Sequence, residues 1–101
     1  MATSKLLDPI APGEILLKEF IEHLGISQNQ LARDLDVPVS RVAAIIAGER
    51  AITADTALRL ASYFEMTAEF WLNLQSDYDL RVARRTVWPK IKDRVRARKV
   101  A

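Results

Sequence analysis

The amino-acid sequence predicts an all-α fold in which five helices form a single domain. Three observations support this prediction: apolar residues recur at helical spacing, residues that begin or end helices stand between the apolar segments, and half of the 101 residues are hydrophobic. We expect an extended arm over residues 1–11, the helical domain over residues 12–88 and a basic tail over residues 89–101. A chain of this length can bury one core, and its stability would still gain from a second copy.

The first helix is expected to run from Pro12 to Gly25. Proline is favoured in the first turn of a helix because its missing amide hydrogen would be unpaired there anyway, and glycine is favoured just past the end. The apolar residues of this segment recur at helical spacing: Leu16, Leu17, Phe20, Ile21 and Leu24. This wide apolar face predicts that the helix covers the core and that Phe20 belongs to it.

Residues 27–48 predict two short helices joined by a tight turn. Ser27 can accept a hydrogen bond from the backbone amide of Gln30 while the Gln30 side chain reaches back, which is the reciprocal arrangement of a capping box. An apolar stripe follows at helical spacing and includes one small residue that lets a second helix approach closely: Leu31, Ala32 and Leu35. A helix should therefore begin at Ser27.

The turn after this helix carries Asp36 and Pro38. Aspartate tolerates a left-handed backbone conformation. Proline has no amide hydrogen, but this costs no hydrogen bond at the first position of a helix, because the amide hydrogens there have no partner within the helix. Val42 and Ile45 stand three residues apart and should face the first helix of the pair. Gly48 supplies the left-handed residue that ends the second helix.

This arrangement is typical of a helix-turn-helix motif, whose second helix enters a DNA major groove. Ser40 can bond to base edges, and Val39 or Ala44 can contact a thymine methyl group. Arg41 is expected to recognise guanine or to hold a phosphate. The periodicity also permits an ordinary helical hairpin inside a small bundle. The residues predicted to contact DNA are Ser27, Gln28, Arg33, Val39, Ser40, Arg41, Ala43, Ala44 and Arg50.

Two further helices are predicted after the motif. The first begins after Thr53 as its N-cap, with Asp55 favourably placed in the first turn and Arg59 as a solvated charge on its surface. Its inward stripe consists of Ala57, Leu60, Ala61 and Phe64. The second and longest helix begins after Thr67 and should stop or kink just before Pro89.

The longest predicted helix carries apolar residues around most of its circumference, which a monomer of this size rarely needs. We therefore expect a homodimer through this helix, which would also hold two recognition helices about 34 Å apart for two half-sites. For Phe70 and Trp71 a plain core position is the alternative, expected for at least one of them. The residues predicted at the dimer interface are Phe70, Leu72, Leu74, Tyr78, Leu80 and Val82.

The positive charge is concentrated at the C-terminal end. Residues 81–101 hold nine Lys or Arg and one acid, whereas residues 1–80 hold six basic and twelve acidic residues. An acidic body repels phosphates, so we expect weak, salt-sensitive DNA binding unless the arginines of the motif and the tail offset this repulsion. The tail after Pro89 can form a short amphipathic helix on a partner, and we expect a frayed end in the free chain.

The composition argues against other classes of protein. The chain has no Cys, so disulfides and thiolate metal sites are excluded, and His23, its single histidine, has no partner at a recognisable spacing. No Gly-rich phosphate loop or nucleophile set is present, so we expect no enzyme, cofactor or metal. The apolar runs are short and interrupted by charge, which predicts a soluble cytoplasmic protein without membrane association.

From Pro12 to Tyr78 the chain resembles the HigA/VapI-type antitoxins of the Xre (Cro/C1) helix-turn-helix family. The strings PGEILLKEF, LARDLDVP, ITADTALRLA and EFWLNLQ carry the resemblance, and the last two in succession are far more specific than a generic helix-turn-helix pattern. The resemblance implies a five-helix, lambda repressor-like domain with a basic C-terminal extension. It also implies a homodimer that binds an operator in its own promoter and neutralises a HigB-like ribosome-dependent mRNA interferase. The alternative is a stand-alone Xre-family regulator without a toxin partner.

The sequence departs from the family pattern at two places in the motif. The turn carries Asp36 where the family often has Gly, and this change is compatible with left-handed backbone. Val39 and Ser40 stand where more polar residues are frequent at the start of the recognition helix. This second departure leaves the operator sequence and the strength of DNA recognition open.

Overall fold

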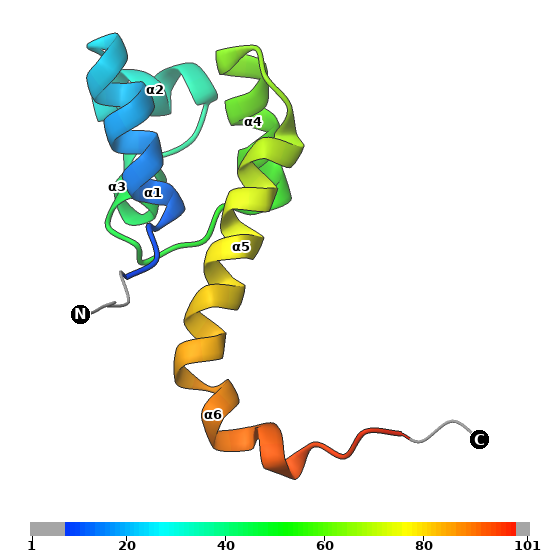
Figure 1. Ribbon diagram of the computed structural model, residues 1–101. Helices are drawn as coiled ribbons and strands as arrows, with labels where there is room; N and C mark the ends of the chain where they lie inside the picture. Colours follow the sequence, from blue (N-terminus) through cyan, green and yellow to red (C-terminus); the bar gives the residue numbers. More distant parts are fainter. Residues whose placement is uncertain (1–7, 99–101) are drawn as a thin grey trace.

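The computed structural model describes residues 8–98, and every regular element within that range is a helix (Figure 1). The all-α prediction is therefore confirmed. The five predicted helices are present, and a short sixth helix and a 3-10 turn follow them. In chain order the elements are α1 (Pro12–Ile15) with its π-helical continuation η1 (Leu16–Glu22), α2 (Gln28–Leu35), α3 (Val39–Ile46), α4 (Ala54–Phe64), α5 (Ala68–Thr86), α6 (Trp88–Ile91) and η2 (Lys92–Arg94).

Helix α5 packs alongside α4 at its start and then extends away from the other helices (Figure 1). Because α6 continues from the far end of α5, it lies well away from α3 (Figure 1). The core lies between the first four helices and the start of α5. Its largest fully buried side chains are Trp71, Leu16, Leu31, Leu60 and Val42.

The first helix changes to π-helical geometry at Leu16. Leu16 and Ile21 are buried, and they stand five residues apart, which is the hydrogen-bond spacing of a π-helix. Phe20 is only half-buried, although the centroid of its ring lies 4.8 Å from that of Phe64. Leu24 is 55% exposed. The predicted single apolar face is therefore wrong at Leu24, because the wider turns of the π-helix change which residues point to the core.

Gly13 lies where α1 packs against the end of α3. A Cβ atom at this position would overlap the carbonyl oxygen of Ile45 and would lie 2.9 Å from the Cα atom of Ile46. Any larger residue would therefore push the two helices apart. The sequence predicts Gly13 only as part of a first turn, whereas the structure uses its missing side chain for close helix packing.

Helix α5 begins and ends as predicted. The hydroxyl of Thr67 accepts a hydrogen bond from the backbone N–H of Phe70 (3.3 Å), and the helix ends at Thr86. Pro89 stands in the first turn of α6, where a proline costs no hydrogen bond. None of the helices in the described range combines the length and the apolar character that crossing a bilayer requires.

The predicted frayed tail is wrong for the part that the structure describes. Helix α6 and η2 occupy the start of the tail, and only residues 95–98 of its described part lack regular structure. At the other end, residues 8–11 of the predicted arm form no helix. Residues 1–7 of the arm and residues 99–101 of the tail lie outside the described residues.

Candidate nucleic-acid interface

The predicted helix-turn-helix is present, and local hydrogen bonds fix both ends of α2. The hydroxyl of Ser27 accepts from the backbone N–H of Gln30 (2.9 Å), whereas no return bond from the Gln30 side chain occurs among the described residues. Only the first half of the predicted capping box therefore forms. Asp36 adopts the predicted left-handed conformation (φ 59°, ψ 48°), and the backbone N–H of Val37 donates to the carbonyl of Ala32 (3.0 Å) to close the helix end.

Helix α3 presents a slim face to solvent. It begins one residue later than predicted, because Pro38 is its N-cap and accepts a hydrogen bond from the backbone N–H of Arg41 (3.0 Å). Val42 and Ile45 are each 2% exposed and pack into the core, as predicted. Ala44 is half-buried, and the other outward residues are exposed. These outward residues are short and uncharged: Val39, Ser40, Ala43, Ala44 and Ala47.

Arg41, the one charged residue within α3, is held against α4. Its Nη1 atom donates to Oδ2 of Asp55 (2.9 Å), and its side chain is only 24% exposed. The Nε atom is buried and has no hydrogen-bond partner in the structure. The guanidinium that is predicted to contact DNA is therefore paired with a carboxylate of the neighbouring helix.

Arg59 ties α4 to the end of α2. Its Nη1 atom donates to the carbonyl oxygens of Leu35 (2.7 Å) and Asp36 (3.2 Å), and its Nε atom donates to Asp55 (3.1 Å). The predicted role of Arg59 as a solvated surface charge is wrong. The reason is that the last carbonyls of a helix have no partner within it, and the left-handed residue turns the chain so that α4 can supply one.

Asp55 joins the two arginines through one carboxylate oxygen, Oδ2. The hydrogen bond from Arg59 contributes most to a lowered pKa of Asp55, the hydrogen bond from Arg41 adds to it, and partial desolvation opposes both. A lowered pKa in the folded state stabilises the fold at neutral pH; this contribution is complete above the ordinary value of 3.8 and is lost progressively as the pH falls from there through the lowered pKa. The carboxylate of Asp55 is therefore ionised at neutral pH.

Two other contacts position the motif from outside. The hydroxyl of Tyr63 on α4 donates to Asp34 of α2 (3.0 Å); burial raises the pKa of Tyr63, and the carboxylate adds to this shift. The side chain of Gln75 on α5 accepts from the backbone N–H of Ile52 (2.8 Å) and donates to Asp79 (2.9 Å). The loop after α3 is thereby fastened to α5, and sequence patterns gave no signal for either contact.

The remaining predicted DNA contacts lie at the edges of the motif. Arg33 on α2 and Arg50 after α3 are both exposed, and neither takes part in an ion pair within the described range. Ser27 is exposed and Gln28 is half-buried at the N-terminal end of α2. Arg33 and Arg50 are therefore the two cations near the motif whose charges are not already paired.

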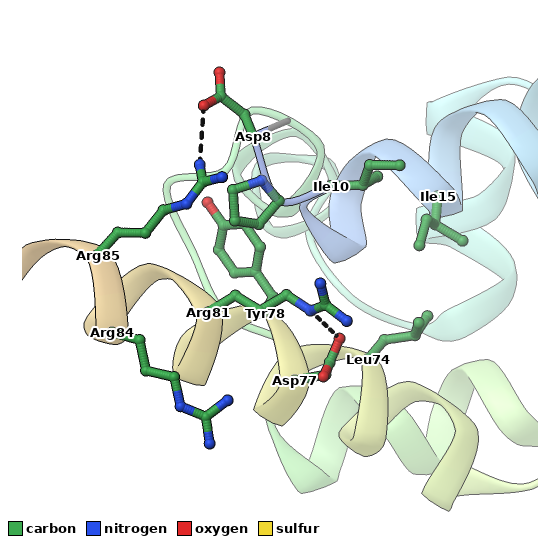
Figure 2. A pocket seen from close by; sticks show the side chains of 10 residues that line it. Asp8, Ile10, Ile15, Leu74, Asp77, Tyr78, Arg81, Arg84 and Arg85 are labelled. Atoms are coloured by element: carbon green, nitrogen blue, oxygen red, sulfur yellow. Dashed lines mark hydrogen bonds and ion pairs between the residues drawn. The ribbon is translucent and has the colours of Figure 1, made fainter. Parts of the chain in front are cut away.

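One side of α5 faces the N-terminal segment of the same chain across a groove of about 640 Å³ (Figure 2). Asp8 of this segment pairs with Arg85 of α5 (3.2 Å) at the edge of the groove (Figure 2). Leu74 and Tyr78, which are predicted at the dimer interface, line this groove. They therefore lie on the side of α5 that the chain itself partly covers.

Another side of α5 is open to solvent. Leu72 is 36% exposed and Leu80 is 50% exposed, and with Ala83 they line a shallow groove of about 610 Å³. Of the other residues predicted at the dimer interface, Phe70 is 37% exposed and packs edge-on against the Trp71 ring, while Val82 is half-buried. Trp71 itself is fully buried.

Residues 17–71 match the family model described as "Helix-turn-helix". The chain belongs to the Xre-type helix-turn-helix family. It is 50% identical over 74 residues to virulence-associated protein I of Dichelobacter nodosus, a match that covers 73% of this chain and 68% of that protein.

Among solved structures, this family member is similar to an addiction module antidote protein of a HigA family from Coxiella burnetii. That likeness has a TM-score of 0.83 at 50% identity and covers 91% of this chain and 100% of the other. It is also similar to the antitoxin HigA of Pseudomonas aeruginosa with the higBA promoter, with a TM-score of 0.83 at 43% identity over 87% of this chain and 96% of the other. The predicted resemblance to HigA/VapI-type antitoxins is thereby confirmed. The family comprises DNA-binding regulators and antitoxins and not enzymes, in agreement with the prediction from the sequence.

Replacing Arg59 by Ala should lower the free energy of unfolding by about 1–2 kcal/mol, because the carbonyls at the end of α2 lose a charged donor that is partly exposed to solvent. Arg81→Ala is the matched control, since Arg81 also pairs with an aspartate four residues earlier but bonds to no helix end. The Arg81→Ala variant should lose about 0.5 kcal/mol or less of the free energy of unfolding. Urea unfolding followed by circular dichroism at one fixed protein concentration measures both values. Equal losses would contradict the role of Arg59.

Proposed function

We propose that this protein is a HigA-like antitoxin that binds operator DNA through α3. The observation that supports this proposal best is the exposed outer face of α3, whose short uncharged side chains allow a helix to enter deeply into a major groove. Similarity to a HigA protein that is described with its promoter gives independent support. A protein of this function acts in the cytoplasm, where its operator lies.

The residues at the interface divide into two groups by their chemistry. We assign recognition of bases to α3, where Ser40 can bond to base edges and where Val39, Ala43 and Ala44 can contact thymine methyl groups. Contacts to the DNA backbone fall to residues around the motif, which position the protein without reading the sequence. The residues assigned to the backbone are Ser27, Gln28, Arg33 and Arg50.

The protein should bind a duplex taken from upstream of its own gene more tightly than a scrambled duplex of the same composition. Replacing Arg50 by Ala should make the slope of log affinity against log salt shallower by about 0.9, because one phosphate contact is lost. Arg81→Ala, which removes a cation from α5 instead, should leave the slope unchanged. Fluorescence anisotropy titrations between 50 and 200 mM salt measure these slopes. Equal affinity for both duplexes would refute operator binding.

We propose further that two copies associate through the open side of α5. Leu72, Leu80 and Ala83 line a shallow groove there together with the polar residues Gln75, Ser76 and Asp79. Leu74 and Tyr78, by contrast, already face the N-terminal segment. A symmetric contact through one helix places the same surface of both copies together. It would also hold two α3 helices in the fixed relative position that a pair of half-sites requires.

Replacing Leu80 by Asp should convert the dimer into a monomer, because a carboxylate would be buried without a partner. The control is Leu58→Asp, since Leu58 is 63% exposed on α4, away from the proposed interface. Sedimentation velocity at micromolar concentration should give a dimer for the wild-type protein and for the control variant. A wild-type protein that sediments only as a monomer would disprove the dimer.

The likeness to HigA antitoxins also supports the proposal that this protein neutralises a HigB-like mRNA interferase. Co-expression tests it: a short neighbouring gene should arrest growth when expressed without this protein and should become harmless when both are expressed. Arrest that this protein does not relieve would favour the alternative, a stand-alone regulator of the Xre family. Operator binding remains to be measured separately, since either outcome is compatible with it.

A further inference from the structure

The ion pair between Arg41 and Asp55 has no role in the proposed function as stated so far. Helix α3 carries one charged side chain, and this pair turns it toward α4. A guanidinium near the start of a recognition helix is normally well placed for a DNA phosphate. Here the carboxylate of Asp55 occupies the position that a phosphate oxygen would take on the guanidinium.

Asp55 restrains its two arginines unequally. Arg59 has a second attachment, because it also donates to the carbonyl oxygens of Leu35 and Asp36 at the end of α2. Arg41 has a single one, the bond from Nη1 to Asp55. Removing the carboxylate would therefore leave Arg59 in place and would free Arg41.

The bond to Asp55 is also one that DNA can displace. Asp55 is 56% exposed, and an ion pair with such exposure is weak and screened by salt. The buried Nε atom of Arg41 has no partner while the pair is closed. A guanidinium that leaves Asp55 and turns toward the duplex exposes its Nε atom, and a phosphate can then accept from both the Nε and the Nη atoms. The exchange thus gives the guanidinium a hydrogen bond that it lacks in the free protein.

We propose that Asp55 is a specificity-determining residue that withholds Arg41 from DNA until α3 is fully seated in its operator. The proposal rests on the proposed function, because it assumes that α3 is the recognition helix. On other sequences α3 does not seat, and Arg41 stays paired and contributes nothing. Asp55 therefore disfavours the wrong DNA rather than strengthening the right one.

The test replaces Asp55 by Asn and measures binding to a scrambled duplex and to the upstream duplex between 50 and 200 mM salt. For the scrambled duplex, the slope of log affinity against log salt concentration should steepen by about 0.9, because the freed Arg41 adds one phosphate contact. The ratio of the variant's affinity to the wild-type affinity should therefore be about 3.5-fold larger at 50 mM salt than at 200 mM salt. The gain on the upstream duplex should be smaller, so that the ratio of the two affinities falls. Asp77→Asn is the matched control, since Asp77 also pairs with an arginine four residues later.

Two outcomes would overturn the proposal: equal effects of Asp55→Asn and Asp77→Asn on the scrambled duplex, or equal gains of Asp55→Asn on both duplexes. In the double variant of Asp55→Asn with Arg41→Gln, the gain should disappear. Arg41→Gln in the otherwise unchanged protein should affect scrambled DNA no more than Arg81→Gln does, because Arg41 is already withheld there. This second comparison keeps the proposal testable if the Asp55 variant fails to fold.

The failure of this proposal and the failure of the proposed function are distinguishable. If the wild-type protein shows no preference for the upstream duplex, the proposed function fails, and the specificity role of Asp55 fails with it. If the wild-type protein prefers the upstream duplex and the Asp55 and Asp77 variants behave alike, only the inference about Asp55 fails.

Discussion

The helix-turn-helix depends on the contact between the guanidinium of Arg59 and the carbonyls at the end of α2. Asp36 ends that helix in a left-handed conformation, which directs the chain into α3 and leaves the carbonyls of Leu35 and Asp36 facing outward from the helix end. Helix α4 supplies the missing donor and brings Asp55 with it. One side chain thus connects the turn of the motif, the helix behind it and, through Asp55, the arginine of α3.

Sequence patterns predicted the parts of this arrangement that depend on residues close to one another in the sequence. Hydrogen bonds that span five residues or fewer form the helix caps at Ser27 and Thr67 and the turn at Asp36. The residue types at these positions are therefore enough to predict them. The bond from Arg59 to Leu35 spans 24 positions, and the bond from Arg41 to Asp55 spans 14. No local pattern encodes contacts of this kind, which is why the sequence predicted Arg59 as a solvated charge and Arg41 as a DNA contact and neither as a partner of Asp55.

The two long helical segments show a second limit of periodicity. The π-helical turns of η1 bring Leu16 and Ile21 to the same buried face and leave Leu24 exposed. A spacing of 3.6 residues instead places Ile21 beside Leu24 and turns Leu16 about 140° away from Ile21. On α5 the periodicity correctly indicated apolar residues on several sides. It did not indicate which side the N-terminal segment would cover, because the fold brings these two parts of the chain together.

The distribution of charge relates the ion pairs of Arg41 and Arg59 with Asp55 to the affinity for DNA. Residues 1–80 carry twelve acids against six basic residues, and the fold pairs Arg41 and Arg59 with a carboxylate. Arg33 and Arg50 are the exposed cations near the motif that lack an ion pair in the described range. Since phosphate contacts supply most of the affinity that is independent of sequence, we expect such a body to hold arbitrary DNA weakly. Under the proposed function, sequence-specific affinity comes from the depth at which the small side chains of α3 fit the groove. A DNA sequence that keeps α3 from seating would then lose both the base contacts and the charge of Arg41.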